Sequence, residues 1–306
     1  MKMTLPPDYK SLAEALVTLY GSSVAIVKTD CVSGGDINKA YALTLNNGEH
    51  VFMKANAKKN APFFTAEAAG LSAIASCGTI KTPEILCTGT DAGDNEGYSF
   101  LLLKYIQSAG KRNDYWETFG RELAQLHKSD TDCIMENKGR FGFFMDNFIG
   151  ARGQLNTPCE SWISFFRDKR LVPQFKAADS YFSSSDRAQI AKLLDHLDEF
   201  LLEPAKPSLI HGDLWSGNAM CGPEGKAVLI DPAAYVGHAE ADLAMTELFG
   251  GFPPEFYDAY REVTPLEPEY ENRRDLYNLY HLLNHLNMFG SSYLGAVLSI
   301  VSEYAG

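Results

Sequence analysis

Long hydrophobic runs and basic residues are both scarce in this sequence. No stretch of the 306 residues approaches the roughly 20 apolar residues that a membrane-spanning helix needs, and the first ten residues lack the apolar core of a signal peptide. The 27 lysines and arginines are outnumbered by 39 aspartates and glutamates, which gives a formal net charge of −12. Because an acidic protein repels phosphate backbones and anionic lipids, we expect neither a nucleic acid nor a membrane as partner.

Cysteine is also sparse and irregularly spaced. The six cysteines form no CxxC pair and show no metal-ligand spacing. In a chain of this length the pattern is typical of reduced thiols, so it predicts a cytoplasmic protein. With 45% hydrophobic and 22% charged residues, the composition is that of a globular protein with a real core. One large domain or two packed lobes is therefore expected.

The secondary-structure signals change character after residue 106. Before it, the pattern predicts strands over 24–32, 39–45, 50–55, 85–90 and 98–106, and helices over 7–20 and 62–77. After it, helical spacing predicts helices over 115–129, 159–170, 185–202 and 254–263, and from 273 to the C-terminus with a break near Gly290. The exception is the segment 208–231, where three mostly apolar residues lead into a polar loop and then a hairpin. The segment 138–158 is expected to be an irregular loop.

These signals together predict an α+β fold of two lobes. The first lobe, over 1–104, has a small antiparallel sheet with one inserted helix and binds the nucleotide. The second lobe, over 105–306, is larger, mainly helical, and carries the catalytic and substrate-binding residues.

The strongest functional signal is the segment HGDLWSGN at 211–218, followed by Asp231. An Asp with an Asn five positions later matches the catalytic loop of protein kinases, in which the Asp accepts the hydroxyl proton and the Asn holds a metal ion. Each of these residues alone is also explained by an ordinary loop with an Asx turn. The loop, the spacing from Asp213 to Asn218, the hairpin and then Asp231 occur in the order found in kinases. This order predicts a kinase that uses ATP and Mg²⁺. Asp213 would be the base, and Asn218 and Asp231 would supply the oxygen ligands that Mg²⁺ prefers.

The same residues resemble the fructosamine kinase (ketosamine-3-kinase) family, within the aminoglycoside phosphotransferase group of protein-kinase-like folds. The resemblance covers nearly the whole chain and is carried by SGGDIN, FMKAN, SWISFFRDKRLVPQ, HGDLWSGN, DPAAYVGHAEADLAM and YNLYHLLNHLNMFG. It implies the bilobal protein-kinase-like fold, dependence on ATP and Mg²⁺, and transfer to the C3 hydroxyl of a ketosamine such as fructosamine or ribulosamine. The ketosamine could be a small molecule or attached to a protein.

The resemblance also implies roles in the first lobe. Lys54 would reach the α and β phosphates and Glu67 would pair with it, although two ordinary surface charges would look the same in sequence. The phosphate-covering loop would contain Gly34 and Gly35, although a GG pair between strands is usually a hairpin turn. The hinge, over 102–106, would meet the adenine through its backbone and would contain Lys104, Tyr105 and Ile106, although an apolar run there is otherwise simply a buried strand. At position 36, where some relatives carry a redox-active cysteine, this sequence has Asp36, so that regulation is not expected.

In the second lobe, three further residues have two possible interpretations each. Trp215 would contact the sugar or its amine, or it would be an aromatic residue of the core or of the contact between the lobes. His211 is expected to be a scaffold residue. Asp242 would anchor the catalytic loop through its backbone, or it would cap a helix.

Two other functions remain open. A related phosphotransferase would act on an aminoglycoside, choline, homoserine or methylthioribose. A pseudokinase would bind nucleotide without turnover and would have lost at least one of Lys54, Asp213, Asn218 or Asp231, all of which are present. We expect a monomer or a weak homodimer.

Overall fold

The computed structural model describes residues 5–33, 37–93, 96–132, 134–135 and 141–305. The chain forms two compact units, and each is made of two separate segments. Unit 1 contains Met1–Tyr115 and Ala219–Pro232, and unit 2 contains Trp116–Asn218 and Ala233–Gly306. A division at residue 104 would place the segment Ala219–Pro232 in the helical part, whereas its contacts group it with the strands of unit 1.

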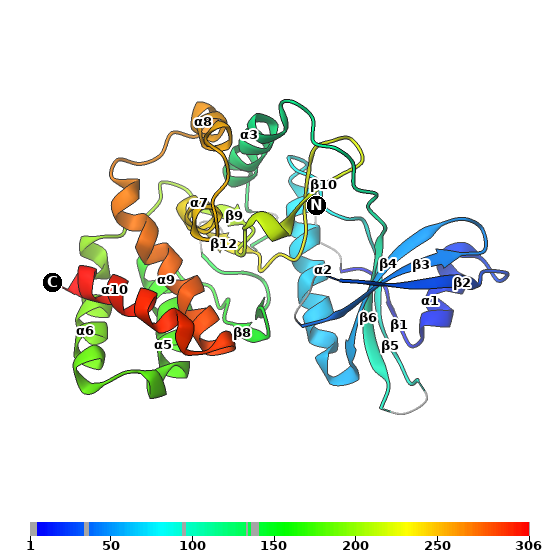
Figure 1. Cartoon of the computed structure of the whole chain (residues 1–306), viewed down its shortest axis with the longest axis horizontal. Coiled ribbons are helices and arrows are strands. Elements are labelled where there is room, and N and C mark those ends of the chain that lie inside the picture. Colours follow the sequence, from blue (N-terminus) through cyan, green and yellow to red (C-terminus); the bar gives the residue numbers. More distant parts are fainter. Residues whose placement is uncertain (1–4, 34–36, 94–95, 133, 136–140, 306) are drawn as a thin grey trace. The chain divides into compact units, whose positions relative to one another are not determined.

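Unit 1 is built on a six-stranded sheet in the order β1-β5-β6-β4-β3-β2 (Figure 1). All neighbouring strands are antiparallel except β1 and β5, which are parallel. The strands are β1 Asp8–Tyr9, β2 Ile26–Val32, β3 Lys39–Leu45, β4 His50–Ala57, β5 Ile85–Asp91 and β6 Tyr98–Lys104. The antiparallel sheet follows from alternating apolar residues between short turns, such as the turn closed by Gly48 with φ +86°.

Two helices and a hairpin complete unit 1. Helix α1, Leu12–Tyr20, is capped by Ser11, and helix α2, Ala61–Ser76, begins after the 3-10 turn η1, Lys58–Asn60. Helix α2 buries Phe64, Ala68 and Leu71 against residues of β6. The hairpin strands β10, Ala219–Cys221, and β11, Ala227–Leu229, pair in an antiparallel manner. Glu67 lies on α2, and Asp231 follows the end of β11 by two residues, so these packed elements fix two charged residues of the unit.

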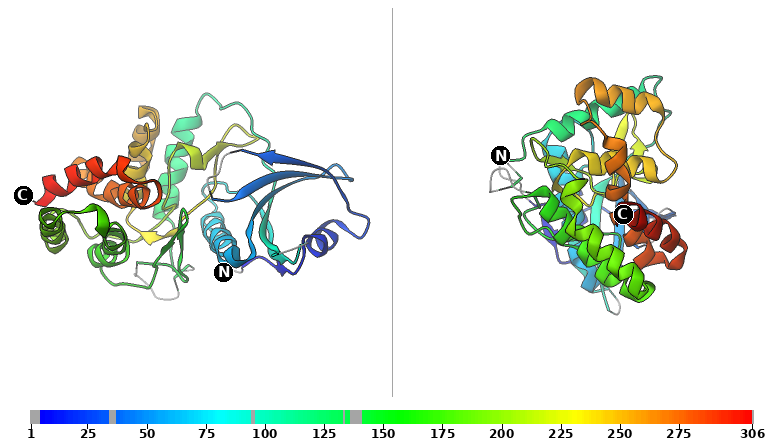
Figure 2. Two further views of the ribbon diagram at one scale, coloured as in Figure 1. Left: turned by 60° about the horizontal axis from the view of Figure 1, so that its bottom comes forward. Right: turned by 90° about the vertical axis from the view of Figure 1, so that its left-hand side faces the viewer.

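Unit 2 consists mostly of helices. They are α3 Tyr115–Lys128, α4 Trp162–Phe165, α5 Val172–Ala177, α6 Ser184–Asp195, α7 Ala239–Leu248, α8 Pro254–Val263, α9 Tyr270–Phe289 and α10 Leu294–Ala305. Shorter turns are the π-helix η2 Phe166–Leu171 and the 3-10 helices η3 Asp179–Tyr181, η4 Leu197–Glu199, η5 Ser216–Asn218 and η6 Ser291–Tyr293. Helix α10 lies beside α9 and also packs on α6 (Figure 2).

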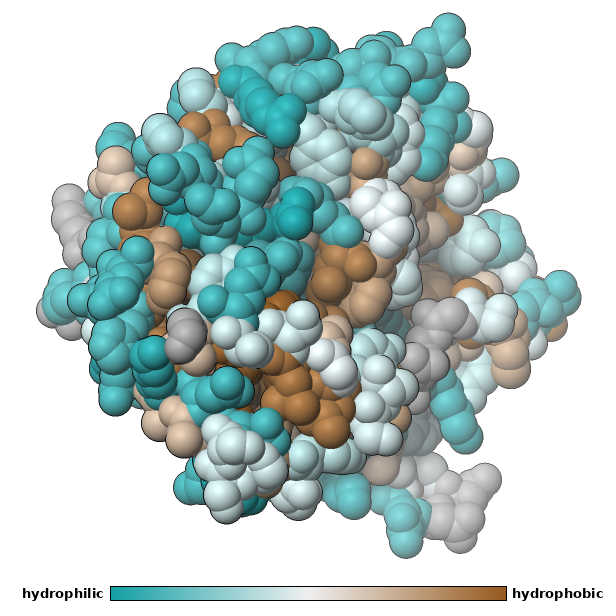
Figure 3. All heavy atoms as spheres, turned by 60° about the vertical axis from the view of Figure 1, so that its left-hand side comes forward, coloured by the Kyte–Doolittle hydropathy of each residue, from teal (hydrophilic) through white to brown (hydrophobic). Residues whose placement is uncertain are grey.

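Two small antiparallel strand pairs lie within unit 2. Strand β7, Asn147–Ile149, pairs with β8, Arg152–Gln154, and β9, Ser208–Ile210, pairs with β12, Tyr235–Gly237. The pairing of β9 with β12 connects the segment before residue 211 to the segment after residue 232. On the face shown in Figure 3, hydrophilic residues predominate and hydrophobic residues form small groups among them. Among the helices that the structure describes, none has the length and apolar character needed to cross a membrane.

Several predicted boundaries were wrong. The first helix begins at Leu12 rather than at residue 7, because Asp8–Tyr9 pairs with β5 instead. The predicted helix over 159–170 is a run of α4, η2 and α5 that continues to Ala177, and the one over 185–202 ends at Asp195. Part of the predicted loop over 138–158 forms β7 and β8, and a helix at α7 was expected only in the alternative in which Asp242 caps it. By contrast, α8 has the predicted bounds, with Pro254 as its first residue.

Candidate active site

Unit 1 contains a cavity of about 240 Å³ that opens beside the sheet. One part of its wall is apolar and includes Ala40, Leu71, Leu103, Met220 and Ile230. Another part is charged and consists of Lys54, Glu67 and Asp231, which we call the lysine cluster. The predicted hinge residues Lys104, Tyr105 and Ile106 also line this cavity. An apolar wall facing a group of charges suits a ligand with one flat, apolar end and one charged end.

Lys54 is the centre of the lysine cluster. It is on β4 with 7% of its surface exposed, and its Nζ donates to Glu67 Oε1 at 2.7 Å and to the carboxylate of Asp231. Burial by itself lowers the pKa of Lys54, but the charges of Glu67 and Asp231 outweigh burial and raise it. The lysine is therefore protonated at neutral pH, held in place from both sides.

For Glu67, the balance between burial and charge is the opposite of that for Lys54, because burial has the larger effect. Burial raises its pKa to about 7, against the opposing attraction of Lys54, and the negative charge of Asp231 adds to the increase. Two carboxylates share one ammonium group, so the more deeply buried carboxylate is the easier one to protonate. When Glu67 is ionised, the cluster has one more negative than positive charge, which a further cation would neutralise.

Asp231 is the open end of the lysine cluster. Its side chain is 41% exposed, compared with 9% for Lys54 and 11% for Glu67. Its backbone has φ +54°, a left-handed conformation that is uncommon for residues other than glycine. Such conformations persist where the surrounding structure enforces them, and they are frequent at functional sites. Here the conformation places an exposed carboxylate two residues after the end of strand β11.

The predicted phosphate-covering loop lies in part outside the described residues, because Gly34, Gly35 and Asp36 are not among them. The residues that follow it, Ile37 and Asn38, line the cavity. Both are held by Asn56, whose Nδ2 donates to Ile37 O at 3.2 Å and to Asn38 Oδ1 at 2.7 Å. Sequence reasoning assigned no role to Asn56, which ends the FMKAN segment two residues after Lys54.

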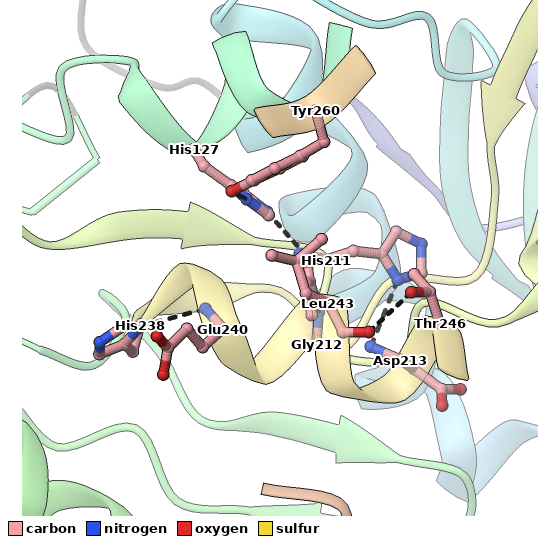
Figure 4. A network of polar contacts seen from close by, with 10 residues as sticks. His127, His211, Gly212, Asp213, His238, Glu240, Leu243, Thr246 and Tyr260 are labelled. Carbon is pink, nitrogen blue, oxygen red and sulfur yellow. Dashed lines mark hydrogen bonds and ion pairs between the residues drawn. The ribbon is translucent and has the colours of Figure 1, made fainter. Parts of the chain in front are cut away.

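In unit 2, residues 211–218 form the loop that we call the HGD loop. It begins after β9 and ends with the 3-10 turn η5. Asp242 of α7 holds its first residues: Oδ2 accepts the backbone N–H of His211 at 2.6 Å, and Oδ1 accepts that of Gly212 at 2.8 Å. His211 and Gly212 are labelled in Figure 4. The N-cap of α7 is His238, four residues before Asp242. Asp242 is thus an anchor of the loop and not a helix cap.

Two residues from other helices complete the surroundings of Asp242. His127 of α3 lies with its Nε2 3.2 Å from Asp242 Oδ2, and its Nδ1 is 2.8 Å from the hydroxyl of Tyr260 on α8 (Figure 4). Burial by itself raises the pKa of Asp242, but the bonds from His127 and the backbone outweigh burial and lower it. Asp242 is therefore an ionised carboxylate in the interior. Nothing in the sequence singled out His127 or Tyr260.

The spacing of Asp213 and Asn218 produces direct contacts within the HGD loop. Asn218 Nδ2 donates to the backbone oxygen of Asp213 at 2.9 Å and to Asp213 Oδ2 at 3.1 Å. The turn between them is closed by the Asn218 backbone N–H, which donates to Trp215 O at 3.0 Å. Both side-chain bonds use the amide nitrogen of Asn218, so its amide oxygen is the atom that can bind a cation.

Two glycines allow the loop to fold in this way. Gly212 has φ +79°, and a Cβ at this position would lie 2.3 Å from the carbonyl oxygen of Ala233. A Cβ on Gly217 would lie 2.4 Å from the indole of Trp215, so only a glycine here leaves room for the indole in its observed position. Trp215 is 39% exposed and contacts Phe249 edge-to-face at 6.4 Å between ring centroids. The structure therefore rules out the alternative that Trp215 is a core residue.

The fructosamine kinase family profile matches residues 9–305 of this chain. The chain belongs to the fructosamine kinase family. A probable ketoamine kinase of Synechocystis sp. is 38% identical over 294 residues, which are 96% of this chain and 95% of that protein. A chloroplastic protein-ribulosamine 3-kinase of Arabidopsis thaliana is 38% identical over 290 residues, which are 93% of this chain and 84% of that protein.

Solved structures agree with this membership. A putative fructosamine-3-kinase of Haemophilus somnus has a TM-score of 0.83 at 28% identity, with 96% of both chains covered. A thermostable mutant of an aminoglycoside phosphotransferase, in a ternary complex with ADP and hygromycin B, has a TM-score of 0.57 at 16% identity and 97% coverage of both chains, and shows the shared fold alone. The predicted family, the α+β bilobal protein-kinase-like fold and the assignment as a phosphotransferase of the ketosamine kinase type are confirmed.

Proposed function

We propose that this protein transfers the γ-phosphoryl group of ATP to the C3 hydroxyl of a ketosamine, with Asp213 as the base. The observation that carries the proposal is the fixed geometry of the HGD loop. Asp242 holds its backbone at His211 and Gly212, and Asn218 holds one carboxylate oxygen of Asp213. A base that is positioned in advance is what phosphoryl transfer requires of the protein, because the reaction depends mostly on orientation and charge.

The cavity of unit 1 is proposed to hold ATP. Its apolar wall suits the adenine ring, and the backbone around Lys104, Tyr105 and Ile106 would contact the edge of the base. Lys54, kept protonated by its two carboxylates, would bind the α and β phosphates, with Gly34 and Gly35 in the covering loop. A local cation is needed here because the chain as a whole has a net charge of −12.

A divalent cation fits the oxygen donors that the chain offers. The amide oxygen of Asn218 and the exposed carboxylate of Asp231 are hard ligands, and Mg²⁺ is commonly bound by one or two such groups together with phosphate oxygens. When bound, the ion would gather the phosphate oxygens and offset their charge. We therefore propose Mg²⁺ as the cofactor and Asn218 and Asp231 as its protein ligands.

In the transfer step, the carboxylate of Asp213 accepts the proton of the C3 hydroxyl. The resulting oxygen bonds to the γ-phosphorus while the bond from phosphorus to the bridging oxygen breaks, and ADP leaves. Asn218 donates its amide N–H to Asp213 throughout and keeps that carboxylate oriented. Trp215, exposed two residues away, would contact the acceptor.

The acceptor class is supported by the relatives, which are named ketoamine kinase and protein-ribulosamine 3-kinase. We propose fructosamines or ribulosamines, as small molecules or attached to proteins. The acidic composition supports a protein that acts without nucleic acid or membrane partners. We also propose that it works in the cytoplasm as a monomer or a weak homodimer.

An ATP-consumption assay over a panel of synthetic ketosamines and related acceptors tests the proposal. We expect turnover with fructosamines or ribulosamines and none with aminoglycosides, choline or homoserine. Asp213→Asn should lower kcat about 10²- to 10⁴-fold and leave ATP binding nearly intact, because the lost group acts on the hydroxyl. Asp231→Asn should instead weaken metal-dependent ATP binding. Turnover with an aminoglycoside alone, or equal loss of ATP affinity in both variants, would contradict the proposal.

A further inference from the structure

A row of aromatic rings in unit 2 begins at the HGD loop and continues away from it. Trp215 contacts Phe249 with centroids 6.4 Å apart, and Phe249 lies 4.8 Å from the ring of His285. His285 in turn lies 5.4 Å from Phe289 and 5.1 Å from Tyr293. We call these five residues the aromatic row. It connects the neighbourhood of Asp213 to the C-terminal end of α9 without a break between rings.

The aromatic row reaches solvent at both ends. Trp215 is 39% exposed and Phe289 is 49% exposed, while Phe249, His285 and Tyr293 are partly exposed. Phe249 follows α7, His285 and Phe289 are on α9, and Tyr293 is in η6, so three packed elements hold the rings in place. A core would bury these rings completely. Their partial exposure in a continuous row therefore indicates a surface suited to a ligand.

The polar group of the row is in its middle. His285 Nδ1 lies 2.8 Å from the backbone oxygen of His281, so Nδ1 carries the hydrogen and donates it. Nε2 is then the acceptor nitrogen of the neutral ring. Burial lowers the pKa of His285, so the ring is neutral at pH 7 and does not repel a cation. A protonated amine could donate to Nε2 and also interact with the faces of the neighbouring rings.

We propose that the aromatic row is the subsite for the amine-bearing part of the ketosamine, with His285 accepting a hydrogen bond from the amine and Phe289 and Tyr293 contacting its substituent. This inference rests on the proposed function and extends it. A ketosamine consists of a sugar joined to an amine, and the amine is cationic at neutral pH. With the sugar hydroxyl at Asp213, the remainder of the molecule extends past Trp215 along the rings. The subsite favours amines with apolar or aromatic substituents over very small ones.

Two acceptors with the same sugar and different amines test this inference. One is the fructosyl adduct of methylamine and the other is the fructosyl adduct of phenethylamine. An aromatic contact contributes about 0.5–1.5 kcal/mol, so Phe289→Ala should lower kcat/KM for the phenethylamine adduct about 2- to 13-fold, through KM. For the methylamine adduct, kcat/KM should change less than about 2-fold, because that substituent does not reach Phe289.

A second variant and a control separate binding from general damage. His285→Leu should raise KM for both adducts and leave kcat nearly unchanged, since both carry the amine that Nε2 binds. Tyr181→Ala removes another exposed aromatic residue of unit 2, in η3, and should change neither acceptor. Calorimetric titration of each adduct into the protein should reproduce the differences in KM as differences in Kd.

Equal effects of Phe289→Ala on both adducts, or no effect on either, would overturn the assignment of the row. If the wild-type protein still turned over both adducts, either of these results would contradict the subsite alone and would be consistent with the proposed kinase function. Turnover of neither adduct by the wild-type protein would instead refute the proposed function, and the subsite with it.

Discussion

Replacing Asp242 by asparagine is the sharpest test of how the HGD loop is held. The wild-type carboxylate accepts the N–H of His211 on one oxygen and that of Gly212 on the other, at 2.6 and 2.8 Å, in a residue that is only 1% exposed. An asparagine keeps one acceptor oxygen, but its NH₂ group would face the second backbone N–H. Two donors then face each other in the interior, where an unpaired donor is costly.

The magnitude follows from these contacts. An unsatisfied buried donor costs about 1–3 kcal/mol, and the remaining bond loses the added strength of a charged acceptor. We expect the free energy of unfolding to fall by about 2–4 kcal/mol, out of the roughly 5–15 kcal/mol typical of globular proteins. Because a displacement of the loop by about 1 Å can cost up to 10²-fold in rate, kcat should fall at least about 10-fold.

Urea denaturation and steady-state kinetics measure the two effects. Asp258→Asn is the matched control, because this aspartate of α8 has a side chain that is 72% exposed and should change stability by less than about 0.5 kcal/mol. The affinity for ATP should change little in either variant, since the cavity is in unit 1. An Asp242→Asn protein with wild-type stability and kcat would refute the anchoring role.

Three further predictions concern the lysine cluster, a glycine and the buried histidines. Lys54→Met should raise KM for ATP at least about 10-fold and destabilise unit 1, because Glu67 loses its buried partner; Lys28→Met, at an exposed lysine of β2, is the control for ATP kinetics. Gly212→Ala should destabilise by about 2–4 kcal/mol and lower kcat, since the new Cβ meets the oxygen of Ala233 at 2.3 Å in a left-handed conformation; a soluble variant with unchanged kcat would contradict this. Burial lowers the pKa of His238 and of His281 to about 3, so the stability that depends on their neutral forms is present above pH 6.5 and is lost as the pH falls towards 3. At pH 5 each histidine should lower the free energy of unfolding by on the order of 2 kcal/mol. The loss should appear as faster amide hydrogen exchange in α7 and α9, after correction for intrinsic rates. Unchanged protection would show that these rings are not buried as neutral groups.

Many elements could be predicted because their signals are local. The turn at Gly48 and the hairpin of β10 and β11 are specified by adjacent turn residues, and α8 by a proline at its start and an apolar face. The first helix was placed too early because Asp8–Tyr9 forms a parallel pair with β5, far along the chain. Strands β7, β8, β9 and β12 are three residues each, which is too short for an alternating pattern to be recognised.

For the residues with predicted chemical roles, too, contacts between neighbours in the sequence could be predicted and contacts between distant segments could not. The contact of Asn218 with Asp213 is contained in their five-residue spacing, because one short turn closes it. The sequence left two possibilities for Asp242, and only the position of α7 decided between them. His127 could not have been found, since it meets Asp242 across 115 positions of the chain. The aromatic row was also invisible in sequence, apart from Trp215.

The amino-acid sequence by itself determined the family, the kinase class and the order of the chemical groups, because these are written in short motifs whose residues act on their neighbours. Only the tertiary structure decided which distant groups share a charge or a hydrogen bond: Lys54 meets Asp231 across 177 positions, and Asp242 reaches His211 across 31. Such contacts depend on how apolar faces pack and on the requirement that every buried polar group find a partner. That requirement applies to the folded chain as a whole, so a short stretch of sequence cannot predict which distant residues become partners.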